Sequence, residues 1–278
     1  MIRRHDTILT EAAPAKVNLA LHLRHKRADG YHALETVFAF TAFGDELTAR
    51  PADTISLALS GEFAGAAGPD ADNLVLRAAH ALAAAAGVTE GAEIALDKRI
   101  PVAAGLGGGS ADAAATLRLL SRLWGLDWSL ERLDAIAATL GSDVPACVHS
   151  RLCFGAGRGE VLAPWPDDLS GTPVLLVNPR VAVPTGPVFA GWDRVDHGGI
   201  AAGAPLATLR NDMTAAACAL APVIGEVLAA LAATGPMLSR MSGSGATCLA
   251  LYHDNAARDR AAAAIAPHGW WQVATHLI

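Results

Sequence analysis

The residues best suited to bind a ligand are glycines that directly precede an apolar segment, in the stretch PVAAGLGGGSADAAATLRLL at 101–120. Glycine loses more conformational freedom on folding than any other residue, so three in succession are costly unless the backbone must be approached closely. Backbone N–H groups at a helix N-terminus bind anions, helped by the helix dipole. The loop therefore predicts a phosphate site made of Gly105, Gly107, Gly108, Gly109 and Ser110.

Two familiar phosphate-binding patterns do not fit this loop. The P-loop needs a lysine before its Ser or Thr, and no lysine follows Lys98. The dinucleotide pattern G-x-G-x-x-G would place a glycine at position 110, where this chain has Ser110, and it belongs to a βαβ unit. A plain turn with Ser110 as the helix cap is the structural alternative, and a hydroxyl that reaches a phosphate or its metal ion is the functional one.

Composition narrows the class of protein. The chain has 278 residues, of which 52% are apolar and 17% charged, so it can build a sizeable core and is not a disordered polymer. A net charge of −6 without a basic patch argues against a nucleic-acid partner. The four cysteines lack metal-site spacing and predict free thiols in a reducing compartment. Without a signal peptide or an uninterrupted membrane span, the sequence predicts a cytoplasmic protein with no membrane partner.

The elements that must position the loop are read from apolar periodicity. The segment at 15–23 alternates with period two, which predicts a strand with Lys16, Asn18 and His22 on its polar face. His22 is expected at the surface. The other predicted strands lie at 33–40, 46–50, 54–59, 92–98, 152–154, 174–177 and 248–252. The predicted helices lie at 74–86, 110–124, 130–140, 212–220, 222–233 and 255–264.

Local signals support these helices and the fold class. Asn73 predicts the N-cap of the first helix and Gly87 its C-terminal stop, while Ser129 predicts the start of the third helix and Gly141 its end. Strands and helices mix without regular βαβ alternation, which predicts an α+β fold with two lobes. We expect the lobes to be residues 1–155, which bind ATP, and residues 156–278, on the substrate side.

Several separated segments resemble one family. PVAAGLGGGSADAA is similar to the phosphate-binding motif of the GHMP kinases, and MSGSGAT at 241–247 resembles their C-terminal glycine motif. PAKVNLALHLRHKRADGYHALETVF, GSDVPACV and FGAGRGE resemble the branch of that family that acts on 4-diphosphocytidyl-2-C-methyl-D-erythritol. The resemblance implies the two-lobed GHMP kinase fold and transfer of the γ-phosphoryl group of ATP, with Mg²⁺, to the 2-hydroxyl of this substrate in non-mevalonate isoprenoid synthesis.

The resemblance also implies roles for single residues. Asp143 matches the catalytic aspartate, which would act as general base toward the attacking hydroxyl or at least position it. A lone Asp in such a sequence is usually a turn or cap residue. Lys16 would keep that carboxylate ionised and orient the hydroxyl, because a nearby positive charge favours the anion. Residues 243–245 approach the phosphates or brace the first loop. The implied substrate contacts are Asn18, Tyr31, His32 and Phe189, and the implied adenosine-side contacts are Asn73 and Lys98.

Two departures and three alternatives stand beside this interpretation. Ala111 replaces a serine that is frequent in the family, and Asn211-Asp212-Met213 matches a family Asn-Asp-Leu-Glu segment only in part. A GHMP kinase for a small alcohol such as homoserine would lack the cytosine contacts of Tyr31 and His32. A nicotinamide-dependent oxidoreductase would need the missing βαβ pattern. A non-catalytic nucleotide-binding module would have no use for a base and its lysine.

Overall fold

The computed structural model describes residues 8–68 and 72–278. The chain divides into two compact units. The first unit contains the described parts of Met1–Ala15, Gly44–Val102 and Gly107–Ser150. The second unit contains Lys16–Phe43, Ala103–Leu106 and Arg151–Ile278. The expected functional division near residue 155 stays a prediction.

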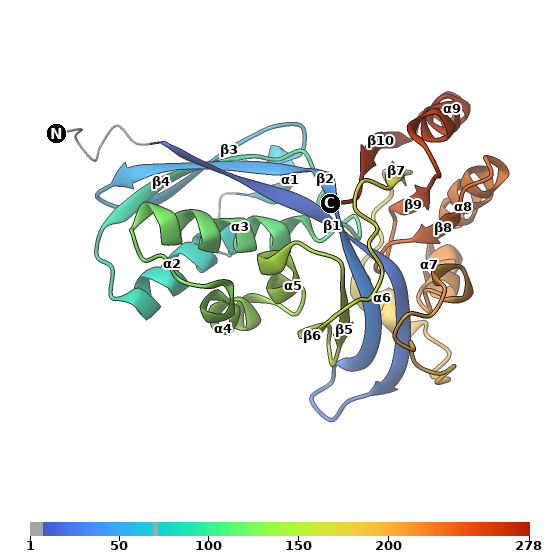
Figure 1. Ribbon diagram of the computed structural model, residues 1–278, viewed down its shortest axis with the longest axis horizontal. Coiled ribbons are helices and arrows are strands. Elements are labelled where there is room, and N and C mark those ends of the chain that lie inside the picture. The colour runs from blue at the N-terminus through green and yellow to red at the C-terminus, as the bar shows by residue number, and fades with distance from the viewer. Residues whose placement is uncertain (1–7, 69–71) are drawn as a thin grey trace. The chain divides into compact units, whose positions relative to one another are not determined.

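The first unit packs helices on a sheet. Strand β3 (Ile55–Ser60) pairs in parallel with β4 (Gly91–Asp97), and β4 pairs antiparallel with the second half of β2 (His32–Ala52). Strand β1 (Leu9–Lys26) pairs with β2. Figure 1 shows the larger helices of this unit gathered on one side of β3 and β4. The helices are α1 (Ala64–Ala67), α2 (Leu74–Ala86), α3 (Gly108–Leu123), α4 (Leu130–Leu140) and α5 (Val144–His149).

Helices α2 and α3 form the core of this unit through small side chains. Ala78 and Ala79 of α2 and Ala113 and Ala114 of α3 are fully buried. The predicted ends of α2 are confirmed: Asn73 Oδ1 accepts a hydrogen bond from the Val75 N–H (2.9 Å), and Gly87 is left-handed with φ +67°. Alanine adds little bulk to a helix face, so α3 can pack closely and hold its N-terminus in place.

The second unit has two antiparallel sheet regions. The first half of β2 pairs with β5 (Cys153–Ala156), which pairs with β6 (Val161–Pro164). A four-stranded sheet has the order β10 (Trp271–His276), β7 (Pro173–Asn178), β9 (Cys248–Leu251) and β8 (Leu238–Met241). The remaining elements are α6 (Thr185–Ala190), η2 (Leu206–Thr208), α7 (Thr214–Leu220), α8 (Val223–Ala233), α9 (Asn255–Ile265) and η3 (Ala266–His268).

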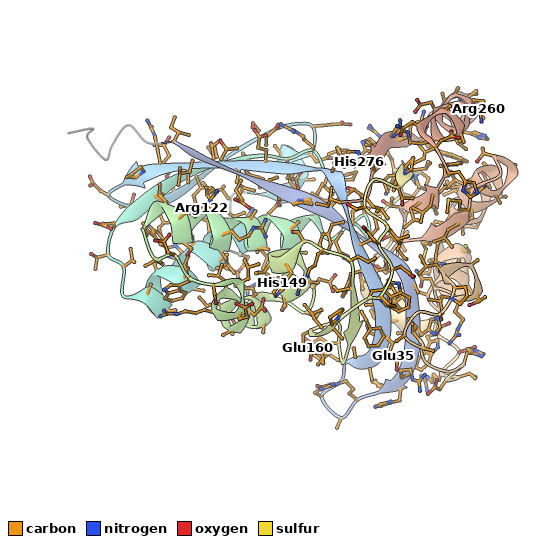
Figure 2. The ribbon with its side chains drawn as sticks, in the orientation of Figure 1. Glu35, Arg122, His149, Glu160, Arg260 and His276 are labelled. Atoms are coloured by element: carbon orange, nitrogen blue, oxygen red, sulfur yellow. The ribbon has the colours of Figure 1, made fainter. Side chains whose placement is uncertain are left out.

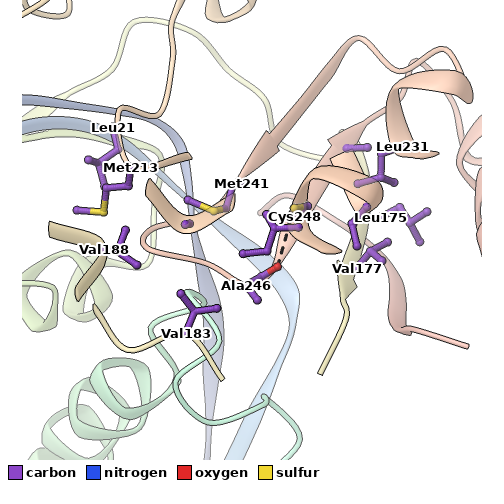
Figure 3. Close-up of a cluster of buried hydrophobic side chains, with 14 of the residues drawn as sticks. Leu21, Leu175, Val177, Val183, Val188, Met213, Leu231, Met241, Ala246 and Cys248 are labelled. Atoms are coloured by element: carbon purple, nitrogen blue, oxygen red, sulfur yellow. Dashed lines mark hydrogen bonds between the residues drawn. The ribbon is translucent and has the colours of Figure 1, made fainter. Parts of the chain in front are cut away.

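An apolar core joins this sheet to the helices of the same unit, and α8 and α9 lie along one side of the sheet in Figure 1. Leu175 and Val177 of β7 pack with Leu231 of α8 in the cluster drawn in Figure 3. Cys248 also lies in this cluster, and burial raises the pKa of its thiol. All four cysteines are free thiols, as predicted, with Cys147, Cys153 and Cys248 buried.

The sequence located most elements but misjudged several bounds. The predicted strands at 33–40 and 46–50 are one continuous strand, β2, and β1 is longer at both ends than predicted. Helix α3 begins at Gly108 rather than near Ser110. Helices α5 and α6 and strands β6, β8 and β10 were not predicted, because they are short and lack a periodic pattern. None of the helices in the described ranges, 8–68 and 72–278, is long and apolar enough to span a membrane.

Candidate active site

The start of α3 has the properties of an anion site. Gly107 is the N-cap residue with φ +61°, and within the described chain no side chain caps this 16-residue helix. The first hydrogen bond of the helix runs from the Ala111 N–H to Gly107 O (2.8 Å). The N–H groups of residues 108–110 precede that bond, so they point outward at the positive end of the helix dipole. Ser110 lies inside the first turn, so the alternative that it caps the helix is wrong.

A buried ion cluster underlies this turn. The Lys98 ammonium pairs with Asp45 and with Asp112 Oδ2 (2.7 Å), and the three side chains are at most 4% exposed. The sequence did not predict Asp45 or Asp112. The Lys98 backbone is also bonded, N to Ser60 O (2.7 Å) and O to the Phe63 N–H (3.0 Å). Lys98 is therefore not the exposed strand end that its place before the glycine loop would also allow, and these contacts argue against the expected adenosine-side contact.

Asn73 and Asp143 stand at helix starts within the same unit. Asn73 Nδ2 donates to Gly68 O (2.7 Å), so the amide that caps α2 is held at both ends. Asp143 is the N-cap residue of α5, and its carboxylate is not used to cap that helix within the described residues. Helix α5 packs on α3 and α4. The fold therefore holds the backbone of Asp143 firmly without using its side chain as a cap.

The second unit orients the predicted residues on β1 through a hydrogen-bond chain. Lys16 Nζ donates to Asn18 Oδ1 (3.0 Å), and Asn18 Nδ2 donates to Thr36 Oγ1 (2.7 Å). The Thr36 hydroxyl then donates to Ala20 O (2.6 Å). Lys16 and Asn18 are 4% and 2% exposed, so a solvated strand face is the wrong description. The Lys16 ammonium also lies 5.4 Å from the centroid of the Phe38 ring, a cation–π contact.

The second glycine motif braces the Gly105 segment. Ser242 Oγ accepts from the Asn18 N–H (3.1 Å) and donates to Gly105 O (2.7 Å). Gly105 has φ +77°, and a Cβ added there would overlap the Ser242 carbonyl oxygen and lie 2.9 Å from Gly245 O. Asn211 holds the motif from behind, because its Nδ2 donates to Met241 O and Gly243 O, both at 2.8 Å. These contacts support the bracing role among the two predicted for residues 243–245.

An aromatic cluster contains the predicted cytosine contacts. His32 stacks on Phe189 with ring centroids 4.8 Å apart, and Trp192 meets His32 edge-on at 5.7 Å. Because His32 and Phe189 are already at stacking distance, a base cannot enter between them. Tyr31 is 56% exposed, and the Arg158 guanidinium lies 5.0 Å from its ring. Arg158 is held by Glu160 (3.4 Å), which is labelled in Figure 2.

His22 does not lie at the surface as the strand pattern predicted. It is 1% exposed, its Nδ1 lies 3.1 Å from Gly198 O, and the Arg210 N–H donates to its Nε2 (3.3 Å). Burial lowers the pKa of His22, and the nearby Arg210 lowers it further. A neutral ring that donates from Nδ1 and accepts at Nε2 satisfies both contacts. Alternation alone missed this because both faces of β1 are covered in this part of the fold.

Comparisons with known proteins identify the family. Residues 73–151 match the model of the GHMP kinases N terminal domain, and residues 198–269 match that of the GHMP kinases C terminal domain. This chain belongs to the GHMP kinase family. A 4-diphosphocytidyl-2-C-methyl-D-erythritol kinase of Rhizorhabdus wittichii is 56% identical, covering 96% of this GHMP kinase and 94% of the relative. One of Novosphingobium aromaticivorans is 53% identical, covering 95% and 90%.

Solved structures agree with the predicted two-lobed α+β fold. A crystal structure of 4-(cytidine 5'-diphospho)-2C-methyl-D-erythritol kinase superimposes with a TM-score of 0.82 at 35% identity, covering 97% of this GHMP kinase and 99% of that chain. Homoserine kinase from Cytophaga hutchinsonii has a TM-score of 0.74 at 18% identity, covering 100% and 96%, a likeness of fold alone. The GHMP kinases use ATP, so this kinase acts on a small molecule with ATP as the phosphoryl donor.

Proposed function

We propose that this GHMP kinase transfers the γ-phosphoryl group of ATP to the 2-hydroxyl of 4-diphosphocytidyl-2-C-methyl-D-erythritol. The observation that carries the proposal is identity of 56% and 53% over nearly the full length to kinases named for that substrate. In the transfer, the hydroxyl oxygen forms the new bond to the γ-phosphorus, the bond to the β-phosphate oxygen breaks, and ADP leaves. The hydroxyl proton passes to a protein base.

The triphosphate binds at the start of α3 in this proposal. The N–H groups of residues 108–110 donate to phosphate oxygens at the positive end of the helix dipole. Leu74 at the start of α2 lies beside Gly109, since a Cβ added to Gly109 would be 3.4 Å from Leu74 Cδ1. Asn73 therefore stands close enough to the phosphate turn for the adenosine-side role that the sequence predicts. The conclusion is a nucleotide that lies across the N-termini of α2 and α3.

Magnesium fits these residues as an ion carried by the nucleotide. Within residues 8–68 and 72–278, no group of three or more acidic, His or Cys residues forms a metal site. Mg²⁺ in kinases is commonly held by substrate phosphates with only one or two protein oxygens. The Ser110 hydroxyl, in the first turn of α3 and not used as its cap, is the protein oxygen that would hold it. Bound there, Mg²⁺ would neutralise charge that develops on the phosphates.

Asp143 is the proposed base, and Lys16 the proposed cation that orients the acceptor hydroxyl. A carboxylate within hydrogen-bond reach of an alcohol accepts its proton in the transition state. Asn18 fixes the Lys16 side chain through its Oδ1, so the ammonium is positioned before substrate binds. Most of the remaining rate enhancement comes from alignment and charge stabilisation, as is usual for phosphoryl transfer.

The aromatic cluster is the proposed cytosine site. The exposed Tyr31 ring offers a stacking surface for a pyrimidine, and Phe189, which stacks on His32, would hold the His32 ring in place for the base. Burial lowers the pKa of His32, with smaller contributions from Lys26 and Arg194, so its ring is neutral at pH 7. A neutral imidazole can donate and accept a hydrogen bond, and the base edge of cytosine presents both partners.

The decisive assay follows ADP release with 4-diphosphocytidyl-2-C-methyl-D-erythritol, homoserine and mevalonate as separate acceptors, and locates the new phosphate by phosphorus NMR. We expect turnover with the cytidyl compound alone, and the 2-phosphate as product. Faster turnover of homoserine would overturn the substrate assignment. Asp143→Asn should lower kcat by about 10²–10⁴-fold with little change in ligand affinity. Asp127→Asn, an exposed loop aspartate, is the matched control and should keep wild-type kcat.

A further inference from the structure

Lys98 lies at the junction between β4 and the phosphate turn, buried in the first unit. Its ammonium pairs with Asp45 of β2 and Asp112 of α3. Asp45 Oδ1 also accepts from the Arg99 N–H (2.6 Å) and the Ile100 N–H (2.7 Å). One carboxylate thus holds three consecutive residues, 98–100, and the same ammonium connects them to the fifth residue of α3.

The same ammonium explains a glycine. A Cβ added to Gly108 would lie 2.9 Å from Lys98 Nζ and 3.1 Å from Ile100 Cγ2, so the ammonium would have to move. Gly108 does not have a positive φ, whereas Gly105 (φ +77°) and Gly107 (φ +61°) do. Backbone conformation therefore does not require glycine at 108. At Gly109 the nearest atom to an added Cβ is Leu74 Cδ1 at 3.4 Å, an ordinary contact.

Stability alone is a weak reason to keep such a cluster. Removing charges from water costs several kcal/mol per ion, and apolar residues often replace a buried ion pair without loss of stability. Asp112 Oδ1 has no hydrogen-bond partner among the described residues, so the cluster is not even fully satisfied. The cluster connects the end of β4 and the 98–100 segment to the first turn of α3, and so fixes their relative positions.

We propose that Lys98 is a positioning residue for the nucleotide: its ammonium, held by Asp45 and Asp112, occupies the side-chain volume of position 108 and sets the first turn of α3 for phosphate binding. The inference rests on the proposed role of that turn in binding ATP. In this proposal Lys98 does not make the contact with adenosine that the sequence led us to expect, but supports the phosphate turn from its buried side.

A double-mutant cycle between positions 98 and 108 tests this. Gly108→Ala should raise the KM for ATP about tenfold while kcat changes less than about threefold, because ground-state phosphate binding is what is lost. Lys98→Met removes the nearest of the atoms that the new methyl group would meet, and leaves two Ile100 carbons at 3.1 and 3.3 Å. Gly108→Ala should therefore raise KM far less in the Lys98→Met protein than in wild type, and the two effects should not multiply.

Matched controls separate positioning from general damage. Gly109→Ala has no contact with Lys98, so its effect on KM should be the same with and without Lys98→Met. If Lys98→Met alone does not fold, the cycle is run on Lys98→Met/Asp45→Asn, which removes the carboxylate charge that the loss of Lys98 leaves unpaired and keeps an oxygen for the Arg99 and Ile100 N–H groups. Multiplicative effects at 98 and 108, or lower Tm values with unchanged KM, would overturn the proposal.

Calorimetric titration with ADP, run on every variant, distinguishes this inference from the proposed function. If wild type binds ADP but does not phosphorylate the cytidyl substrate, the substrate assignment fails while the cycle in ADP affinity still tests Lys98. If wild type turns over normally and the cycle shows no coupling, only the positioning role fails.

Discussion

Replacing Asp112 by Asn should change how the stability of this kinase depends on pH. Burial raises the pKa of Asp112 to about 8, although Lys98 opposes this, and Asp45 raises it further. Burial is the dominant cause, because the Asp112 side chain is 4% exposed and its Oδ1 has no hydrogen-bond partner among the described residues. The folded protein then keeps a proton that the unfolded chain, with an ordinary Asp pKa near 3.8, has already released.

The sign and size of the effect follow from proton linkage. Between the unfolded and folded pKa values the native state binds one more proton, so the free energy of unfolding falls as pH rises, by about 1.4 kcal/mol per pH unit. Between pH 5.5 and pH 7.5 the wild-type protein should lose about 2–3 kcal/mol from this group. Asp112→Asn keeps the shape and an acceptor for Lys98 but has no proton to lose.

Urea unfolding of both proteins across that pH range measures the difference directly, because the titration of His22, His32 and the other groups is common to both. The stability of Asp112→Asn relative to wild type should rise by about 2–3 kcal/mol from pH 5.5 to pH 7.5. A difference that stays constant with pH would show that Asp112 is ionised throughout, and would refute the burial argument.

Three further predictions concern the second unit. Gly105→Ala should lower Tm strongly, because a positive φ alone costs about 1–2 kcal/mol and the methyl group would also overlap the Ser242 carbonyl oxygen. Differential scanning fluorimetry measures this with Gly109→Ala as the control variant, and equal Tm values for the two variants would contradict it. Arg240→Met should lower the free energy of unfolding by about 3–5 kcal/mol in chemical denaturation, because the buried guanidinium donates to the carbonyls of Leu19, Leu206 and Leu209. A loss below about 1 kcal/mol would show that water takes over the hydrogen bonds of the guanidinium. The lowered pKa of His22 means that the unfolded state binds more protons below pH 6.5, so the free energy of unfolding should fall as pH drops through that region. His22→Gln should remove part of this fall in urea unfolding. An unchanged profile would show that the pKa of His22 is the same in the folded and unfolded states.

Sequence reasoning was most successful where a residue acts on its immediate neighbours. Asn73 and Gly87 end α2 as predicted, because capping needs only the local backbone. The start of α3 was misplaced by two residues, since the helix begins at Gly108 rather than near Ser110, with Gly107 as its N-cap. Glycine and serine both occur at helix N-caps, so the local sequence does not show which of the two residues caps α3. Only the packing of the turn decides between them.

The candidate site was only half visible in the sequence. The resemblance to the GHMP kinases pointed to Lys16 and Asn18, and the run of glycines before a helix pointed to the phosphate turn; these roles stay predictions. Asp45, Thr36 and Ser242 carry no motif that one sequence could reveal, and each reaches its partner across tens or hundreds of residues. Their roles depend on distance in space, which periodicity does not contain.

The sequence alone therefore predicted the α+β fold class from short patterns of residue type, and its resemblance to the GHMP kinases predicted the kind of chemistry; both are confirmed. The phosphate turn stays a prediction. Only the tertiary structure decided that Lys98 is buried between two carboxylates, that His22 is enclosed and that His32 stacks on Phe189. Side chains become buried and form ion pairs or ring stacks only when distant segments of the chain meet. Removal from water then changes the pKa of a side chain and the partners that it can bind.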